Sequence, residues 1–161
     1  MLSFRRIFFA ALFLVSSCGF SPLYNNQNST KLAEKISIQE PKTQNEFIFY
    51  SQLTNRFPEG GGKYVLNYAI TTSKKDSGLN FDGTAHRVEI TSSVSFSVTD
   101  TETGLKVLSD KEEMYLSYSN FGSTAAVLNA DRITNKELIV LLADKVADKI
   151  SIVIVEKIHE T

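Results

Sequence analysis

Residues 88–100 read V-E-I-T-S-S-V-S-F-S-V-T-D and show the clearest alternation in the chain. Apolar side chains stand at the first, third, seventh, ninth and eleventh positions, and mostly hydroxyl-bearing side chains stand between them. A period of two residues predicts a β-strand with one face on a core and the other face in water. The stretch therefore predicts a sheet that is covered on one side only.

Two stretches before this one also have the pattern of strands. Residues 35–39 alternate between apolar and polar side chains and predict a short strand. Residues 64–71 alternate over a greater length and predict a second strand, with tyrosine, leucine and isoleucine on one face. The K-K-D-S-G segment that follows, residues 74–78, predicts a polar turn or loop.

The sequence after residue 99 predicts a hairpin and a fourth strand. D-T-E-T-G at residues 100–104 predicts the hairpin turn, with a glycine near its end. Residues 105–119 predict the strand that follows. The charged residues 110–113 interrupt its alternation, so we expect a bulge or a protruding bend at that point.

Residues 44–57 have the helical period. Thr43 and Glu46 stand at the spacing of a capping box, in which each side chain accepts a hydrogen bond from the other residue's backbone. Apolar side chains then recur at steps of three and four residues from Phe47 to Phe57. This spacing predicts an amphipathic helix with one apolar face.

The C-terminal segment predicts a second and longer helix. Thr134 and Glu137 have the capping-box spacing, and Asp131 is an alternative N-cap. Apolar side chains then recur at steps of three and four, so we expect the helix to continue to about residue 156. Isoleucine and valine crowd residues 150–155 and leave a terminal strand as the alternative, although the continuing stripe favours the helix.

These elements follow one another in the order β-α-β-β-β-α. The order predicts an α+β fold, a two-layer sandwich in which two helices lie on one face of a four-stranded, mainly antiparallel sheet. The predicted core consists of apolar side chains from the strands and from one face of each helix: Phe47, Tyr50, Leu53, Leu66, Ile70, Val88, Ile90, Val94, Phe96, Val98, Leu142, Val146 and Ile150.

The N-terminus has the three parts of a secretory signal peptide. Arg5 and Arg6 precede nine apolar residues, and two serines then lead to Cys18, the single cysteine of the chain. A helix of nine residues is about 13 Å long, well short of the roughly 30 Å hydrocarbon core of a bilayer. The segment therefore predicts a cleaved leader and not a mature transmembrane span.

The residues around Cys18 indicate which kind of leader this is. V-S-S-C at residues 15–18 resembles a bacterial lipobox, which predicts cleavage between Ser17 and Cys18 and acylation of the Cys18 thiol. Several acyl chains on one cysteine would hold the protein firmly on a membrane. The alternative is an ordinary signal peptide that is cleaved elsewhere, with an incidental thiol at Cys18.

The prediction divides the chain into a signal peptide at residues 1–17, a lipidated N-terminus and tether at 18–33, and a single α+β domain at 34–161. Removing the signal peptide leaves 144 of the 161 residues, which is enough for one domain with its own core. This part has 15 basic and 18 acidic residues, a net charge near −3. A nucleic-acid partner is therefore not expected.

The sequence shows no motif for catalysis, metal binding or a cofactor. His86 and His159 are the two histidines, and neither belongs to a metal-binding or serine-hydrolase motif. A single cysteine excludes a disulfide framework and a thiolate metal cluster. We therefore expect a protein that is not an enzyme and that holds no metal or cofactor.

The C-G-F-S-P-L-Y sequence at residues 18–24 resembles the start of the lipopolysaccharide (LPS)-assembly lipoprotein family LptE in its alphaproteobacterial form. The strand at residues 84–100, and the final helix after Y-S-N-F at residues 118–121, are similar in architecture. The resemblance implies a lipoprotein that forms a plug inside the outer-membrane β-barrel LptD, helps it to fold and assists LPS insertion into the outer leaflet. Gly19 after Cys18 implies transport to the outer membrane, on the periplasmic side.

LPS carries phosphates, so direct contact would call for basic side chains. The candidates are Lys74, Lys75, Arg87 and Arg132, each of which is otherwise an ordinary solvated charge. The hydroxyl-rich face of the sheet would suit the polar lumen of a barrel. The alternative function is a generic envelope lipoprotein that assists another barrel or a secretin.

Overall fold

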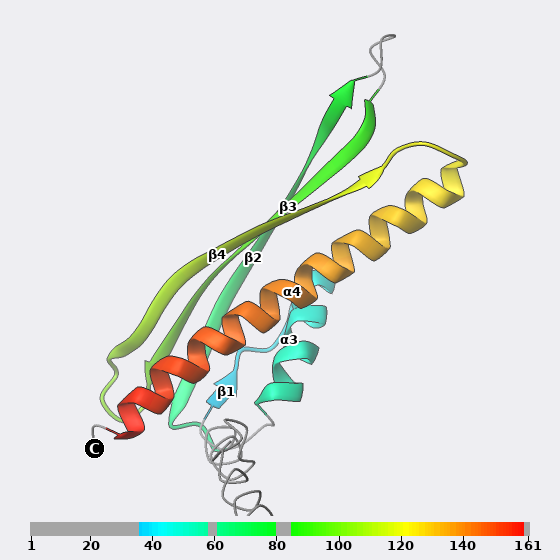
Figure 1. Ribbon diagram of the computed structural model, residues 1–161. Coiled ribbons are helices and arrows are strands. Elements are labelled where there is room, and N and C mark those ends of the chain that lie inside the picture. Colours follow the sequence, from blue (N-terminus) through cyan, green and yellow to red (C-terminus); the bar gives the residue numbers. More distant parts are fainter. Residues whose placement is uncertain (1–35, 58–60, 80–84, 160–161) are drawn as a thin grey trace, which may run out of the picture.

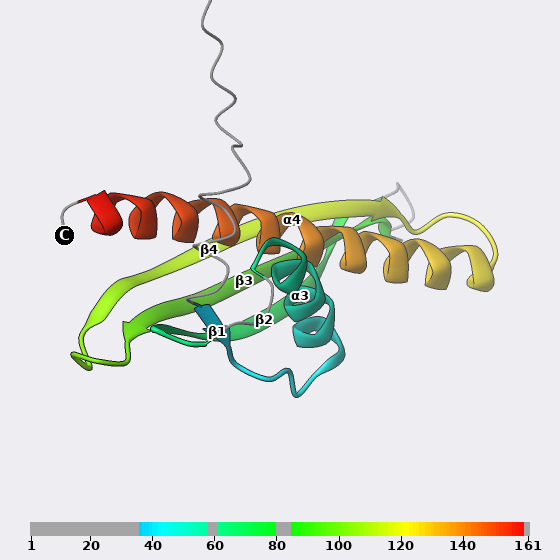
Figure 2. The same cartoon turned by 90° about the horizontal axis from the view of Figure 1, so that it is seen from below.

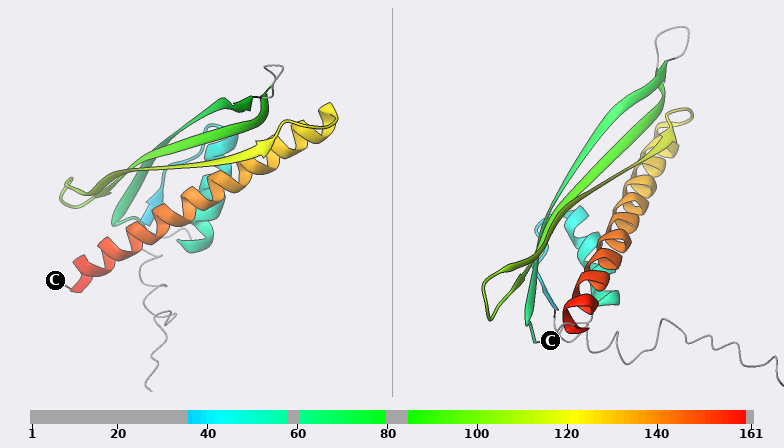
Figure 3. Two further views of the ribbon diagram at one scale, coloured as in Figure 1. Left: turned by 45° about the horizontal axis from the view of Figure 1, so that its top comes forward. Right: turned by 60° about the vertical axis from the view of Figure 1, so that its left-hand side comes forward.

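The computed structural model describes residues 36–57, 61–79 and 85–159. Over these ranges the chain forms four strands and two helices in the order β1, α3, β2, β3, β4, α4 (Figure 1). The strands make one sheet with the order β1-β2-β3-β4, and both helices lie on the same face of it (Figure 3). This arrangement confirms the predicted α+β fold. The predicted signal peptide, lipidation site and tether lie outside the described residues.

Two strands of 16 residues each form the centre of the sheet. β2 (Tyr64–Leu79) pairs antiparallel with β3 (Ala85–Asp100) along its whole length. The turn predicted at residues 74–78 is wrong, because β2 continues through this segment and pairs it with β3. The polar side chains of residues 74–78 alternate between the two faces of the sheet and do not interrupt the ladder. A polar composition was therefore not enough to predict a turn.

The hairpin after β3 is confirmed. Gly104 has a positive φ of 69°, and one Asp100 carboxylate oxygen accepts hydrogen bonds from the backbone N–H groups of Glu102 and Thr103 at 2.8 and 3.1 Å. These bonds, led by the one from Thr103, lower the pKa of Asp100. The turn is therefore held by the side chain of its first residue.

β4 (Lys106–Ser119) pairs antiparallel with β3 and forms one edge of the sheet. The irregularity expected at residues 110–113 is wrong. The register shift lies next to the hairpin instead, between Val98 and Thr99 of β3. Residues 110–113 stay in the ladder because Asp110 and Glu112 have lysine partners on α4, which the local sequence does not reveal. Lys111 and Glu113 pair with each other on the other face.

The opposite edge begins with a parallel pair. β1 (Ile36–Ile38) pairs with the first residues of β2, and α3 (Gln44–Arg56) makes the connection between them. The predicted capping box is confirmed, with Thr43 Oγ1 accepting from the Glu46 N–H at 3.3 Å and a Glu46 carboxylate oxygen accepting from the Thr43 N–H at 3.2 Å. Figure 2 shows α3 beside the middle of α4.

The buried face of α3 is shifted from the predicted one. Phe49 and Leu53 are buried, and Phe57 at the C-cap is buried with them. Phe47 is 64% exposed, so its predicted place in the core is wrong. The three buried residues recur every four positions, and this stripe faces the sheet, so the helix turns Phe47 toward solvent.

α4 (Thr124–His159) has 36 residues and begins ten residues before the predicted cap. Ser123 provides the cap, since its Oγ accepts from the Ala126 N–H at 3.3 Å. The capping-box sequence from Thr134 lies inside the helix, and the alternative terminal strand is excluded by the helical conformation of residues 150–155. In the described ranges, no helix combines the length and the apolar character needed to cross a bilayer.

The core fills the space between the sheet and the C-terminal part of α4. None of the described side chains from residue 124 to 137 is fully buried, whereas a continuous buried stripe begins at Leu138. Of the predicted core, Tyr50 and Ile70 are only half-buried. The residues that are buried as predicted are Leu53, Leu66, Val88, Ile90, Val94, Phe96, Val98, Leu142, Val146 and Ile150.

Candidate binding cleft

A chain of polar side chains crosses the molecule from β3 to α4. Ser92 is fully buried in the apolar row of β3, and its Oγ lies 2.8 Å from Thr72 Oγ1 of β2. Thr72 Oγ1 accepts a hydrogen bond from the Asn45 amide of α3 at 3.1 Å, and Asn45 Oδ1 accepts from the Asn135 amide of α4 at 2.8 Å. This series of hydrogen bonds therefore links β3, β2 and α4, with α3 between the sheet and α4.

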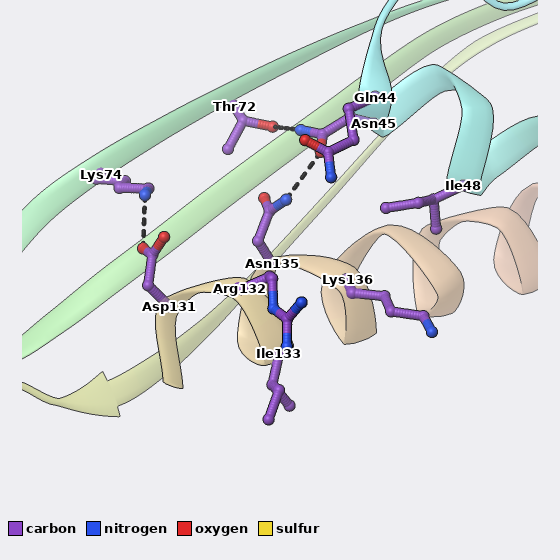
Figure 4. Close-up of a pocket in the computed structure, with 10 residues that line it drawn as sticks. All are labelled: Gln44, Asn45, Ile48, Thr72, Lys74, Asp131, Arg132, Ile133, Asn135 and Lys136. Atoms are coloured by element: carbon purple, nitrogen blue, oxygen red, sulfur yellow. Dashed lines mark hydrogen bonds and ion pairs between the residues drawn. The ribbon is translucent and has the colours of Figure 1, made fainter. Parts of the chain in front are cut away.

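An open cleft of about 650 Å³ lies at the α4 end of this chain (Figure 4). Its volume is in the range of small-molecule sites. Its described lining comes from α3, β2 and α4, and none comes from β3 or β4, so the cleft opens on the β2 side of the sheet. The lining residues are Gln44, Asn45, Ile48, Thr72, Lys74, Asp131, Arg132, Ile133, Asn135 and Lys136.

The cleft has an excess of positive charge. Lys74 is neutralised by Asp131, whose carboxylate oxygen lies 2.5 Å from the lysine Nζ. Arg132 donates only to the neutral Asn129 side chain at 3.2 Å, and the Lys136 side chain has no ion pair or hydrogen bond within the described ranges. Three cations and one carboxylate leave a net charge of about +2 in a protein whose mature chain is acidic.

Asp131 also connects α4 to the edge strand β4. The Tyr118 hydroxyl donates to the same Asp131 oxygen at 3.0 Å. Burial, and then this hydrogen bond, raise the pKa of Tyr118. The N-terminal part of α4 is thus held against the sheet by polar contacts on both β2 and β4.

The structure divides the four predicted LPS-contacting residues between two faces. Lys74 and Arg132 both line the cleft, on the helix side of the sheet. Lys75 and Arg87 lie on the opposite, uncovered face, where Lys75 is paired in register with Glu89. Sequence reasoning missed Lys136, although its position one helical turn after Arg132 was a usable signal.

The uncovered face of the sheet carries the hydroxyl row expected from the sequence. Its β3 residues alternate with the buried ones, and a shallow groove of about 310 Å³ runs across β2, β3 and β4 on this side. The groove is lined mainly by small polar side chains. Among them are Asn67, Ser95, Ser97 and Ser109.

Two acidic pairs, Glu112 with Glu113 and Asp144 with Asp148, have basic partners. Glu112 of β4 is buried and contacts two lysines of α4. Asp144 and Asp148 of α4 both pair with Arg56 of α3, at 3.6 and 3.3 Å. These charges join elements and do not form a catalytic pair.

Ser17 and Cys18, at the expected cleavage and lipidation site, lie outside the described residues. His86 is exposed on β3, and its ring packs over Gly78. A Cβ added at Gly78 would lie only 2.8 Å from the ring atom Cε1. The described ranges contain no group of three or more His, Cys, Asp or Glu side chains that could hold a metal ion.

No protein-family model matches the chain, and no curated protein matches it in sequence. Solved structures do match it in fold. An inferred lipoprotein from Caulobacter crescentus superposes with a TM-score of 0.65 at 16% identity, over 81% of this chain and 97% of that chain. Rare lipoprotein B from Shewanella oneidensis gives 0.61 at 16% identity, over 76% and 96%.

A minor lipoprotein from Acinetobacter baumannii gives a TM-score of 0.55 at 21% identity, over 74% of this chain and 91% of that chain. Each of these neighbours is covered almost completely. The chain therefore has the fold of these bacterial lipoproteins.

Proposed function

We propose that the chain is a non-enzymatic outer-membrane lipoprotein that acts as plug and folding partner of the LPS-assembly β-barrel LptD and assists LPS insertion. It is anchored through lipid on Cys18 and faces the periplasm and the barrel lumen. The observation that carries the proposal is the agreement of two independent features. The sequence at residues 18–24 resembles the start of the LptE family, and the domain that follows has the fold of solved bacterial lipoproteins.

The open face of the sheet supports a place inside a barrel. Both helices cover the same face of the sheet (Figure 3). The hydroxyl row of β3, with its neighbours on β2 and β4, belongs to the other, uncovered face. The lumen of a barrel is polar and hydrated. A face of serine, threonine and asparagine side chains can form hydrogen bonds there without needing an apolar interface.

Contact with LPS phosphates is best assigned to the outer-face pair, Lys75 and Arg87. Arg87 is directly opposite Ser77, two residues after Lys75 on the same face, so the two cations are diagonal neighbours. Lys74 is already neutralised by Asp131 and faces the other way. One phosphate therefore cannot be shared by all four predicted basic residues.

The proposal is tested by affinity purification of the tagged full-length chain from detergent-solubilised envelopes, with mass spectrometry of the proteins that co-purify. We expect one large outer-membrane barrel, LptD, at a ratio near one to one. A Cys18→Ala variant serves as the control for membrane attachment.

Purification of a secretin or of another barrel would favour the alternative function, a generic envelope lipoprotein that assists a different assembly. Recovery of the chain without any barrel would reject the plug proposal.

A further inference from the structure

We propose that the cleft and the adjoining free edge of β2 form a docking site for an extended, acidic segment of a partner protein. The inference goes beyond the plug proposal, because it rests only on the cleft, its charge and the strand edge next to it. It assigns a role to Arg132 and Lys136 that the LPS contact does not use.

The edge of β2 is available along most of its length. β1 pairs only with Tyr64–Leu66, and the Gln39 side chain accepts from the Tyr68 N–H at 3.4 Å. From residue 69 to 79, the described part of the chain gives β2 a strand partner on its β3 side only. Unpaired backbone groups at such an edge can accept an added strand.

The cleft opens beside this free edge. Thr72 and Lys74 belong to the free stretch of β2 and line the cleft (Figure 4). A segment lying in the cleft would therefore run alongside backbone groups that lack a partner strand. This proximity favours an extended peptide, because a compact ligand would not use the edge.

The two free cations have the spacing of an extended chain. Arg132 and Lys136 are four residues apart on α4, which is a rise of about 6 Å along the helix axis. Carboxylates two residues apart on one side of a β-strand are separated by about 6.5 Å. One acidic side chain can therefore face each cation, and the net charge of the cleft favours that sign.

The walls of the cleft fit the apolar side chains of such a segment. Ile48 and Ile133 lie on two sides of it, and Ile133 is 52% exposed although it is an aliphatic side chain. Amide groups at Gln44, Asn45 and Asn135 complete the lining with hydrogen-bonding groups. The side chains of Arg132 and Lys136 are both exposed at the rim of the cleft. At that position they can pair with carboxylates of a bound peptide, whereas a small anion would need cations that enclose it.

The test uses the full chain in detergent and a fluorescein-labelled nonapeptide that alternates glutamate and valine. A lysine–valine peptide is the charge-reversed control, and binding is followed by fluorescence anisotropy at low salt. We expect the acidic peptide alone to bind. The double variant Arg132→Gln with Lys136→Gln should weaken binding by roughly tenfold or more, since two charge pairs are lost.

A matched variant, Lys106→Gln with Lys111→Gln, removes two exposed lysines of β4 that lie outside the cleft and away from the free edge of β2, and should change binding by less than about twofold. Thermal unfolding confirms that both variants fold. Hydrogen exchange should show new protection of β2 amides at residues 73–79 when the acidic peptide is added.

Three results would overturn the proposal. Equal loss of binding in both double variants would mean that only net charge matters. Binding without new protection of β2 would exclude strand addition. The third result is that the chain binds glucosamine 6-phosphate but not the peptide, and that the cleft variant loses this binding. The cleft would then be a site for small anions. Purification of LptD tests the plug function separately, so either proposal can fail alone.

Discussion

Lys149 of α4 lies with its ammonium nitrogen 2.6 Å from an Asp110 carboxylate oxygen of β4, and it also contacts the carboxylate of Glu112. Lys145, one turn earlier, lies 2.5 Å from the other oxygen of Glu112. The Glu112 side chain is only 7% exposed. Four charged residues therefore join the C-terminal half of the long helix to an edge strand.

The first prediction concerns the pH dependence of this contact. Hydrogen bonds from the lysines hold the pKa values of Asp110 and Glu112 below their ordinary values of 3.8 and 4.5. A carboxyl group whose pKa is lower in the folded state stabilises the fold above its unfolded pKa, and this contribution is lost as the pH falls through the folded value. Glu112→Gln should lower the melting temperature at pH 7, and the difference from wild type should shrink below pH 4.5.

The matched control is Glu113→Gln, at the next position and on the opposite face of β4. Its side chain is exposed and pairs with Lys111 only at 3.6 Å. Thermal unfolding between pH 7 and 3 should give this variant the wild-type profile. A constant difference between Glu112→Gln and wild type across that range would contradict the assignment.

The second prediction concerns the helix face that covers the core. Val146 has no exposed surface, so Val146→Asp would bury an unpaired carboxylate and should destabilise the fold by more than about 3 kcal/mol. Phe96→Asp on β3 should act in the same direction. Leu141→Asp, at an exposed position of the same helix, should change stability by about 1 kcal/mol or less. Urea unfolding measures all three. A lower midpoint for Leu141→Asp than for Val146→Asp would show that the faces of the helix are reversed.

The third prediction separates two phenylalanines of α3. Phe49 is fully buried, and its ring centroid lies 4.9 Å from that of Tyr68. Phe49→Ala should therefore lower the unfolding free energy by about 3 to 5 kcal/mol. Phe47→Ala removes the same atoms from an exposed side chain and should change it by less than about 0.5 kcal/mol. Denaturant unfolding measures both variants. A larger loss for Phe47→Ala than for Phe49→Ala would show that Phe47 belongs to the buried face, as the sequence predicted.

The fourth prediction concerns Tyr68, whose buried hydroxyl has no hydrogen-bond partner within the described ranges. Burial, followed by the charge of Glu46, raises the pKa of Tyr68 to about 12. The folded state thus holds this proton more tightly than the unfolded state, and stability is lost as the pH rises from 10 towards 12. Tyr68→Phe should match or exceed wild-type stability at pH 7 and flatten the alkaline loss.

Tyr64→Phe, at another buried tyrosine of β2, is the control for removal of a hydroxyl group. Thermal unfolding at pH 7, 10 and 11 distinguishes the two variants. An alkaline loss in Tyr68→Phe as steep as in wild type would refute the prediction.

The elements with local signals could be predicted from the sequence. The strand at residues 88–100 follows from its period of two, and the start of α3 follows from Thr43 and Glu46, because both depend on neighbouring residues. The start of α4 was missed because a capping-box sequence occurs inside the helix. Ser123, the actual cap, has Ala126 at the position where a capping box has a glutamate.

The cleft and the ion pairs depend on contacts between distant parts of the chain. Lys74 was expected in a turn, and its strand conformation depends on pairing with Ile90, while its charge is matched by Asp131. Glu112 was expected at a bulge, and it remains in the ladder with Lys145 as its partner. Nothing in the local pattern around either residue indicates which partner the fold will bring to it.

The position of the buried stripe of α4 has a consequence for how the chain acquires its structure. Among the described side chains, those that α4 contributes to the core come from residues 138 to 154, close to the end of the sequence. During synthesis, the inner sides of β2 and β3 are complete long before their cover exists, so the nascent polypeptide must keep an apolar sheet surface from aggregating. A product terminated before residue 138 would keep that surface permanently open and be a substrate for proteases and chaperones.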